Sequence, residues 1–136
     1  MNISYELFPA RNKHKSEELI QVINKLDKTN PHFYSMTFGA SGSSQNATFA
    51  TIGNIDDNTN VDIVPHLTCI GSNKNRIIKM LNKYKKLGIN RIVLLRGDFD
   101  DFTKDVEDFK YCNELVEFVK EKYHNEFKIY VAAYPE

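Results

Sequence analysis

The spacing of the apolar segments constrains the fold more than any other feature of this sequence. Five short segments rich in β-branched and aromatic residues alternate with four segments whose apolar residues recur every three to four positions. Each strand and helix together take roughly 30 residues, the size of a βαβ module, in which consecutive parallel strands are joined by right-handed helical crossovers. The sequence therefore predicts an α/β fold made of parallel β/α repeats.

The segment 89–98 contains the clearest of the expected strands, from Arg91 to Leu95. Its aliphatic run has no polar face, which is typical of a parallel strand covered by helices on both sides. It ends in Arg96-Gly97-Asp98, and ligands of α/β proteins bind at the carboxyl ends of strands. Arg96 is one of only four arginines, so a side chain suited to bidentate binding of phosphate or carboxylate occurs where Lys is otherwise favoured. Taken alone, the motif also fits a solvated loop with a surface ion pair.

The other expected strands are 3–8, 33–38, 61–68 and 128–133. The expected helices begin at Ser16, about Gln45, Ser72 and about Phe109, and Gly88 is the expected C′ residue of the third. The apolar residues of these helices should face the sheet. They are Leu19, Ile20, Val22, Ile23 and Leu26, then Phe49, Ile52 and Ile55, then Ile77, Ile78, Leu81, Tyr84 and Leu87, and finally Leu115, Val116, Phe118 and Val119.

Polar side chains occur at equivalent positions near the carboxyl ends of all five expected strands. They are Glu6, Thr37, His66, which follows Pro65 near the end of the third strand, Asp98 and Tyr134. Because right-handed crossovers bring the carboxyl ends of parallel strands to one rim, we expect these side chains to surround one ligand. Glu6 lies in an apolar strand, where a carboxylate is costly to bury unless it is paired or functional. A lone histidine in an apolar run is more often a hydrogen-bonded core residue, and that alternative stays open for His66.

Charge and hydropathy exclude several classes of partner. Lys plus Arg equals Asp plus Glu at 18 each, and no basic stripe is present, so we expect binding neither to nucleic acid nor to an anionic membrane. No apolar run has transmembrane length, and the first residues lack the apolar region of a signal peptide, so the expected location is the cytoplasm. The 41% of hydrophobic residues is enough for the core of one ordinary domain.

The sequence predicts no metal site. Cys69 and Cys112 are far apart in the sequence and match no metal or redox spacing, so both are expected to be free thiols. The acidic segment 99–110 lacks the glycine and the terminal glutamate of a calcium loop and is expected to be a solvated charged loop.

Five short motifs occur in order along the chain: Tyr5-Glu6-Leu7-Phe8-Pro9, Ser35-Met36-Thr37-Phe38-Gly39-Ala40, Pro65-His66-Leu67-Thr68-Cys69, Leu95-Arg96-Gly97-Asp98 and Ala132-Ala133-Tyr134-Pro135-Glu136. In this combination and order they resemble the motifs of the methylenetetrahydrofolate reductases, flavoproteins of one-carbon metabolism that make 5-methyltetrahydrofolate for methionine synthesis. The resemblance implies a TIM-type (β/α)8 barrel that holds FAD at the carboxyl ends of its strands and receives electrons from NADH or NADPH.

The resemblance also implies roles for individual residues. Carried over by position, Glu6 matches the general acid that helps protonate the folate so that its five-membered ring opens to an iminium, and a carboxyl group in an apolar strand is well placed to have its pKa raised. Asp98 matches the carboxylate between flavin and pterin, where it orients the folate and tunes the flavin. Thr37 matches a residue at the nicotinamide and flavin site. The other matches to FAD contacts are Phe38, Ala40, His66, Arg96, Gly97, Tyr111 and Tyr134, of which Arg96 would act through charge-assisted hydrogen bonds.

A barrel of this kind takes about 250 residues and eight strands. The 136 residues predict only the first five strands and four helices of one, as a single incomplete domain over residues 1–136. We expect weak or no activity from this chain alone, a folate as its substrate, and self-association through the two open sheet edges.

Two other interpretations remain open. One is a non-catalytic half-barrel that self-associates or binds a partner without redox chemistry. The other is an unrelated barrel or a flavodoxin-like binding domain, whose phosphate loop would have to be 39–44, a segment that matches no Walker or dinucleotide fingerprint.

Overall fold

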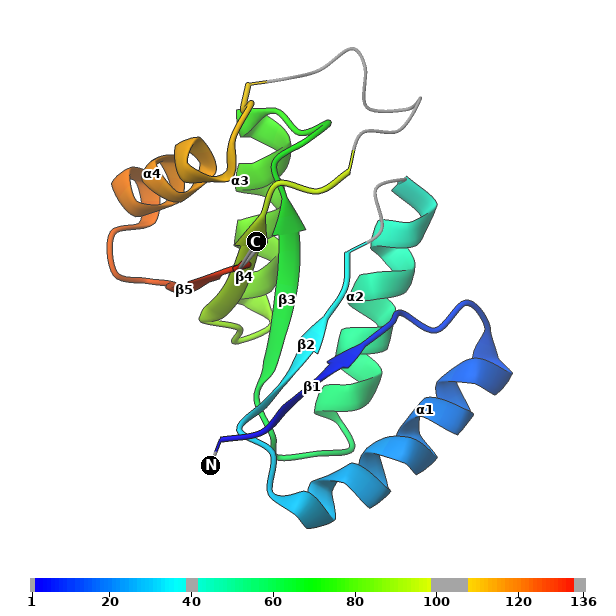
Figure 1. The fold of residues 1–136 in the computed structure, drawn as a ribbon. Helices are drawn as coiled ribbons and strands as arrows, with labels where there is room; N and C mark the ends of the chain where they lie inside the picture. Colours follow the sequence, from blue (N-terminus) through cyan, green and yellow to red (C-terminus); the bar gives the residue numbers. More distant parts are fainter. Residues whose placement is uncertain (1, 39–41, 99–107, 134–136) are drawn as a thin grey trace. The chain divides into compact units, whose positions relative to one another are not determined.

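The computed structural model describes residues 2–38, 42–98 and 108–133, with the backbone only at 42–44. Strands and helices alternate within these ranges (Figure 1). The elements are β1 (Ser4–Leu7), α1 (Lys13–Leu26), the 3-10 helix η1 (Asp27–Thr29), β2 (Phe33–Met36), α2 (Gly42–Asp56), β3 (Ile63–Thr68), α3 (Lys74–Lys86), β4 (Arg91–Leu95), α4 (Cys112–Tyr123) and β5 (Lys128–Val131). Neighbouring strands pair in parallel in the order β1-β2-β3-β4-β5. The predicted parallel β/α architecture is confirmed.

The chain forms two compact units, residues 1–65 and 66–136. The first unit holds β1, α1, η1, β2, α2 and the start of β3. Tyr34 and Met36 of β2 are fully buried on one face of its strands. Ile23 of α1 and Ile52 and Ile55 of α2 are buried as well, as the helical spacing predicts, and they complete the core of this unit.

The second unit holds the end of β3 followed by α3, β4, α4 and β5. Leu67 lies in register with Leu94, and both are fully buried, as is Ile92 on the same face of β4. The helices contribute the buried residues Ile77, Met80, Leu81 and Tyr84 from α3 and Leu115, Val119 and Tyr123 from α4. The strands alternate between this helix-covered face and a half-buried face that carries His66, Thr68 and Val93.

Two helices begin at positions other than those predicted, because an asparagine provides the cap. The backbone N–H of Lys15 donates to Asn12 Oδ1 at 2.9 Å, so α1 begins before Ser16. The N–H of Arg76 donates to Asn73 Oδ1 at 2.8 Å, so α3 begins after Ser72. An Asn side chain caps a helix as well as a Ser side chain does, and local sequence does not decide between neighbouring candidates.

The predicted end of α3 is confirmed, whereas the start of α4 lies later than predicted. Gly88 follows the C-cap with a φ of +77°, the left-handed conformation expected of a C′ glycine. Helix α4 begins at Cys112 rather than at Phe109. Phe109 precedes the helix and is buried with its ring 5.4 Å from that of Phe118.

A buried tyrosine ties three segments of the first unit together. Tyr34 Oη donates a hydrogen bond of 2.6 Å to Asp27 Oδ1 in η1. Thr59 Oγ1, from the segment between α2 and β3, donates 2.8 Å to the other carboxylate oxygen, Asp27 Oδ2. Burial, reinforced by the hydrogen bond to Asp27, raises the pKa of Tyr34, so the phenol stays neutral in the folded chain.

Candidate functional site

The described site residues fall into two groups, one in each unit. Glu6, Thr37 and Phe38 belong to the first unit, and the second unit carries His66, Arg96, Gly97, Asp98 and Tyr111. Ala40 and Tyr134 lie outside the described residues. The convergence of all these residues on one ligand therefore stays a prediction.

In the first unit, Glu6 and Thr37 lie on neighbouring strands and on the same face. Glu6 is in register with Ser35, and the N–H of Thr37 donates to Leu7 O at 3.0 Å just past the end of β2. Because side chains alternate along a strand, Glu6, Ser35 and Thr37 point away from the face that carries Tyr34 and Met36. Two of the three predicted site residues of this unit, Glu6 and Thr37, are thus brought together.

Glu6 is exposed, so the expectation of a carboxylate buried in an apolar strand is wrong. The physical reason is its position. β1 stands at one end of the strand order, and the Glu6 side chain lies on the face opposite the one that carries the buried Tyr34 and Met36. The sequence shows the apolar neighbours of Glu6 but not which strand is an edge.

A groove of about 530 Å³ runs along β1, and Glu6 lines it. The residues after β1 and one side of α1 complete it: Leu7, Phe8, Pro9, Ala10, Arg11, Lys15, Glu18, Leu19 and Val22. The N–H of Ala10 donates to Thr51 Oγ1 of α2 at 3.0 Å, which fixes the segment that follows the strand.

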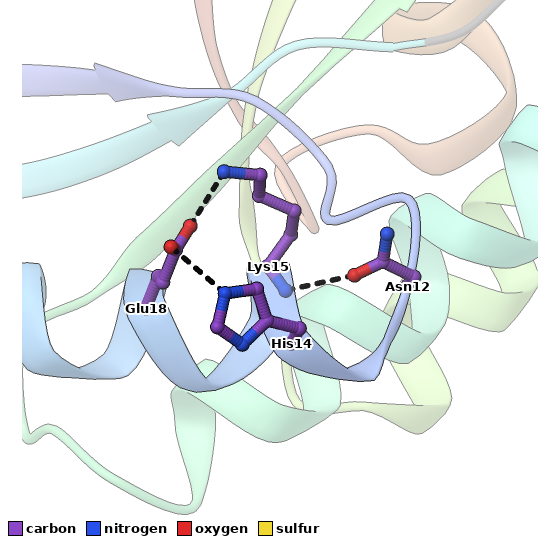
Figure 2. A network of polar contacts seen from close by, with 4 residues as sticks. All are labelled: Asn12, His14, Lys15 and Glu18. Carbon is purple, nitrogen blue, oxygen red and sulfur yellow. Dashed lines mark hydrogen bonds and ion pairs between the residues drawn. The ribbon is translucent and has the colours of Figure 1, made fainter.

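Charged residues of α1 form a network at this groove (Figure 2). Lys15 Nζ donates to Glu18 Oε2 at 2.7 Å, and His14 Nε2 lies 3.2 Å from Glu18 Oε1. The hydrogen bond from Lys15 lowers the pKa of Glu18, although desolvation opposes it. The rim of the groove therefore carries a lysine and a carboxylate that interact with each other.

In the second unit, the ends of β3 and β4 run side by side beyond the strands themselves. The N–H of Cys69 donates to Leu95 O at 3.1 Å, and the N–H of Ile70 donates to Arg96 O at 3.0 Å. His66 lies inside β3, in register with Val93, as the predicted strand 61–68 implies. The strand continues through Pro65 because the fixed φ of proline is compatible with an extended chain.

Gly97 occupies a position that favours glycine over any other residue. Its φ is +80°, and a Cβ at this position would lie 3.0 Å from both Cβ and Cγ2 of Thr68. Glycine alone tolerates this combination of backbone angle and close contact. The sequence did not mark Thr68 as a site residue, although Thr68 belongs to the same short motif as His66. The reason is that its contact with Gly97 depends on the register of β3 and β4.

Arg96 is linked to the segment of Tyr111 by a hydrogen bond to Lys110, the residue before Tyr111. Arg96 Nε donates to Lys110 O at 3.4 Å. Glu114 Oε2 accepts from the N–H groups of Lys110 at 2.6 Å and Tyr111 at 3.1 Å, and these bonds lower the pKa of Glu114. The first turn of α4 therefore holds the segment against Arg96.

The chemistry of this corner suits an anionic ligand with aromatic rings. Arg96 is exposed, the Tyr111 ring is 51% exposed, and Lys110 Nζ lies 5.5 Å from the centre of that ring. Guanidinium groups bind phosphate oxygens through charge-assisted hydrogen bonds, and an exposed ring offers a stacking surface. The missing Cβ of Gly97 leaves room for the side chain of Thr68, which packs against this turn of the chain. The corner thus offers a cation and a ring surface, and the binding of FAD to it stays a prediction.

At the end of the acidic segment, Asp108 and Lys110 are exposed and lie outside any helix or strand, as the prediction of a solvated charged loop implies. Asp108 Oδ2 accepts from the N–H of Lys74 at 2.8 Å, and the N–H of Asp108 lies 3.4 Å from Ser72 O. Asp108 thereby provides a carboxylate at the N-terminus of α3, where it is favoured by the helix dipole. Residues 99–107 lie outside the described ranges.

Both cysteines are free thiols, as predicted. Cys69 is buried, and its Sγ lies 3.4 Å from Arg96 O. Burial, together with the neighbouring Cys112, raises the pKa of Cys69 to about 11. A thiol is nucleophilic only as the thiolate, so Cys69 is inert at neutral pH.

Two further features do not occur in the described part of the chain. Within it, no three His, Cys, Asp or Glu side chains cluster as metal ligands would. In the same ranges, no helix combines the length and the apolar character needed to cross a membrane.

The fold and these residues define a class of protein, a parallel β/α protein with polar groups at the carboxyl ends of its strands. Residues 1–136, the whole chain, match the family described as methylenetetrahydrofolate reductase. The chain belongs to this family.

Curated relatives agree with the family assignment. The 5,10-methylenetetrahydrofolate reductases of Pectobacterium carotovorum subsp. carotovorum and Escherichia coli (strain K12) are 35% and 36% identical to it over 136 residues. These matches cover 100% of this chain and 44% and 45% of the two relatives. Methylenetetrahydrofolate reductase 1 of Schizosaccharomyces pombe is 34% identical over 98% of this chain and 23% of its own length. The chain thus spans less than half the length of the curated relatives that it matches.

Proposed function

We propose that this chain provides the N-terminal part of a methylenetetrahydrofolate reductase active site. The whole site would reduce 5,10-methylenetetrahydrofolate to 5-methyltetrahydrofolate with NADH or NADPH, with FAD as its bound cofactor. The observation that carries the proposal is the corner formed by Arg96, Gly97 and Tyr111, in a chain that matches the family over its whole length. This corner combines a cation, a backbone without a Cβ and an exposed aromatic ring.

Several residues of this chain would hold the cofactor. Arg96 would bind its phosphates, and Tyr111 would provide a ring surface beside it. The remaining cofactor contacts proposed by position are Thr37, Phe38, Ala40, His66, Gly97, Asp98 and Tyr134. When bound, FAD would supply the hydride transfer between the nicotinamide and the folate.

Two carboxyl groups would act on the folate. Glu6 would donate a proton to a ring nitrogen of the folate, so that the C–N bond to the methylene carbon breaks and the five-membered ring opens. Glu6 is exposed in this chain and lines the groove at the end of β1. Asp98, also exposed and next to Gly97, would orient the folate.

A chimera tests this proposal. In it, this chain replaces the matched part of the Escherichia coli relative, and bound flavin is measured by absorbance after gel filtration. Reduction is then followed as NADH oxidation with menadione as acceptor, and separately with the folate. We expect flavin binding and both activities.

Three variants and a control assign the roles in the chimera. Arg96→Gln is expected to weaken flavin binding at least about tenfold, the loss of one charge-assisted contact. Glu6→Gln is expected to keep flavin and menadione reduction but lose folate reduction. Asp98→Asn should lower folate reduction more than menadione reduction. Lys79→Gln, which removes an exposed cation on α3, should change neither flavin binding nor the two activities. A folded chimera without flavin would contradict the proposal.

A non-catalytic module that self-associates is the second candidate. It is favoured by Val131, which is 59% exposed in β5, the last strand of the order. This candidate predicts a discrete oligomer by light scattering and no flavin binding by the chain or the chimera.

A further inference from the structure

The segment that leads into α4 is anchored where it begins. Asp108 Oδ2 accepts a hydrogen bond from the N–H of Lys74, the first residue of α3. The next residue, Phe109, is buried, and its ring centre lies 5.4 Å from that of Phe118 in α4. These two contacts tie the start of the segment to both helices of the second unit.

One carboxylate oxygen fixes the rest of the segment. Glu114 Oε2 accepts from the N–H of Lys110 at 2.6 Å and from the N–H of Tyr111 at 3.1 Å. In return, the N–H of Glu114 donates to Tyr111 O at 3.2 Å. The backbone bond from Tyr111, followed by that from Lys110, lowers the pKa of Glu114, so its side chain is charged at neutral pH. The backbone of both residues is thereby bound to the first turn of α4.

The same peptide group also contacts Arg96. Its C=O, from Lys110, accepts from Arg96 Nε at 3.4 Å, and its N–H, from Tyr111, donates to Glu114. A peptide group is planar, so a bond that fixes its N–H also fixes the direction of its C=O. Glu114 therefore acts on the Arg96 guanidinium through one rigid unit, and it acts on the Tyr111 ring through the residue that carries it.

We propose that Glu114 is a positioning residue of the flavin site. Its carboxylate holds the peptide group between Lys110 and Tyr111, and through that group it keeps the Arg96 guanidinium and the Tyr111 ring in the arrangement that binds the cofactor. The inference rests on the proposed function, because it takes the ligand of this corner to be FAD. Glu114 itself does not touch the cofactor in this proposal.

The physical reason for such a residue is preorganisation. A segment that is ordered only when the ligand arrives loses conformational freedom at that moment, and this loss weakens binding. Arg96 and Tyr111 are both exposed, so contacts within the protein have to hold them in place before the ligand binds. Glu114 provides two of these contacts from a single side chain.

The first experiment uses this chain without any cofactor. Amide hydrogen exchange of Lys110 and Tyr111 is compared between the parent and Glu114→Ala, and circular dichroism confirms that both are folded. We expect exchange at both amides to be at least about fivefold faster in the variant, because their acceptor is gone. Glu121→Gln, which neutralises an exposed carboxylate on the same helix, should leave both rates unchanged.

The second experiment measures the dissociation constant of FAD by flavin fluorescence in the chimera with the Escherichia coli relative. Glu114→Ala should raise it about tenfold, and Glu114→Gln, which keeps an acceptor oxygen, only about threefold. Asn12→Ala is the control for stability, because it removes the side-chain cap of α1 and should leave FAD binding unchanged.

A double-mutant cycle separates positioning from a purely structural role. When Arg96 is already replaced in Arg96→Gln, one of the groups that Glu114 positions is missing. Adding Glu114→Ala should then raise the dissociation constant of FAD by less than about threefold instead of about tenfold. A residue that only stabilises α4 would weaken binding by the same factor in both backgrounds.

Three outcomes would overturn the inference while the proposed function stands. They are a parent chimera and a Glu114→Ala chimera that bind FAD equally, an effect of Glu114→Ala that Arg96→Gln does not reduce, and exchange rates at Lys110 and Tyr111 that Glu114→Ala does not change. A folded parent chimera that binds no FAD is a different result. It would overturn the proposed function and, with it, the role of Glu114 in cofactor binding.

Discussion

The hydrogen bond between Tyr34 and Asp27 should contribute measurably to the stability of the first unit. Tyr34→Phe removes one oxygen and keeps a ring that is fully buried, so the loss is that of the hydrogen bond and not of packing. Hydrogen bonds to charged groups contribute about 1.5–3 kcal/mol. Asp27 is half-exposed and keeps its bond from Thr59, so water can replace the phenol on the carboxylate. We therefore expect a loss of about 1.5 kcal/mol, the lower end of that range.

Urea unfolding followed by far-UV circular dichroism measures this loss, because the sequence has no Trp to report by fluorescence. The midpoint should fall and the slope should stay constant. Tyr5→Phe is the matched control, because the hydroxyl of Tyr5 lies 3.0 Å from Thr29 Oγ1 at an exposed site. Its loss should stay below about 0.5 kcal/mol. Equal effects of the two substitutions would refute the reasoning from burial and charge.

Three further predictions concern the second unit and its glycine. Gly97→Ala should destabilise the chain by about 1–2 kcal/mol, because the φ of Gly97 is +80° and the added Cβ would contact Thr68. Gly53→Ala in α2 is the control. Its Cβ would meet nothing within 4 Å, so it should stabilise the chain in the same urea unfolding assay. The lowered pKa of Glu114 means that its stabilisation is present above the ordinary glutamate pKa and is lost as the pH falls through the lowered value. Glu114→Gln should therefore be less stable than the parent at pH 7, and a difference that persists at about pH 2 would contradict this linkage. Cys69, whose pKa is raised to about 11, should resist iodoacetamide at pH 8 in the folded chain and react in urea, as mass spectrometry of the labelled peptide would show.

The repeat of the sequence was sufficient to predict the fold class. A strand or a helix is recognised from the period of its apolar residues, which is a local property, and β4 was found with the bounds Arg91–Leu95 that the structure gives. The buried residues of α2 and the left-handed conformation of Gly88 followed from the same local rules.

The site was predicted less completely, because side-chain surroundings depend on residues far apart in the sequence. Glu6 was expected to be buried and is exposed, since only the order of the strands shows that β1 is an edge. The register of His66 with Val93 likewise comes from the pairing of β3 with β4 and not from the sequence around the histidine. The contact of Thr68 with Gly97 depends on the same register.

The sequence by itself determined which segments are strands and helices, and, through its family motifs, which residues are candidates for chemistry. Only the tertiary structure decided which side chains meet. It placed the carboxylate of Asp27 between Tyr34 and Thr59, and it placed the segment of Tyr111 against Arg96. The physical reason is that periodicity and turn preferences act over a few neighbouring residues, whereas burial and hydrogen bonding in these places join groups 7 to 32 positions apart.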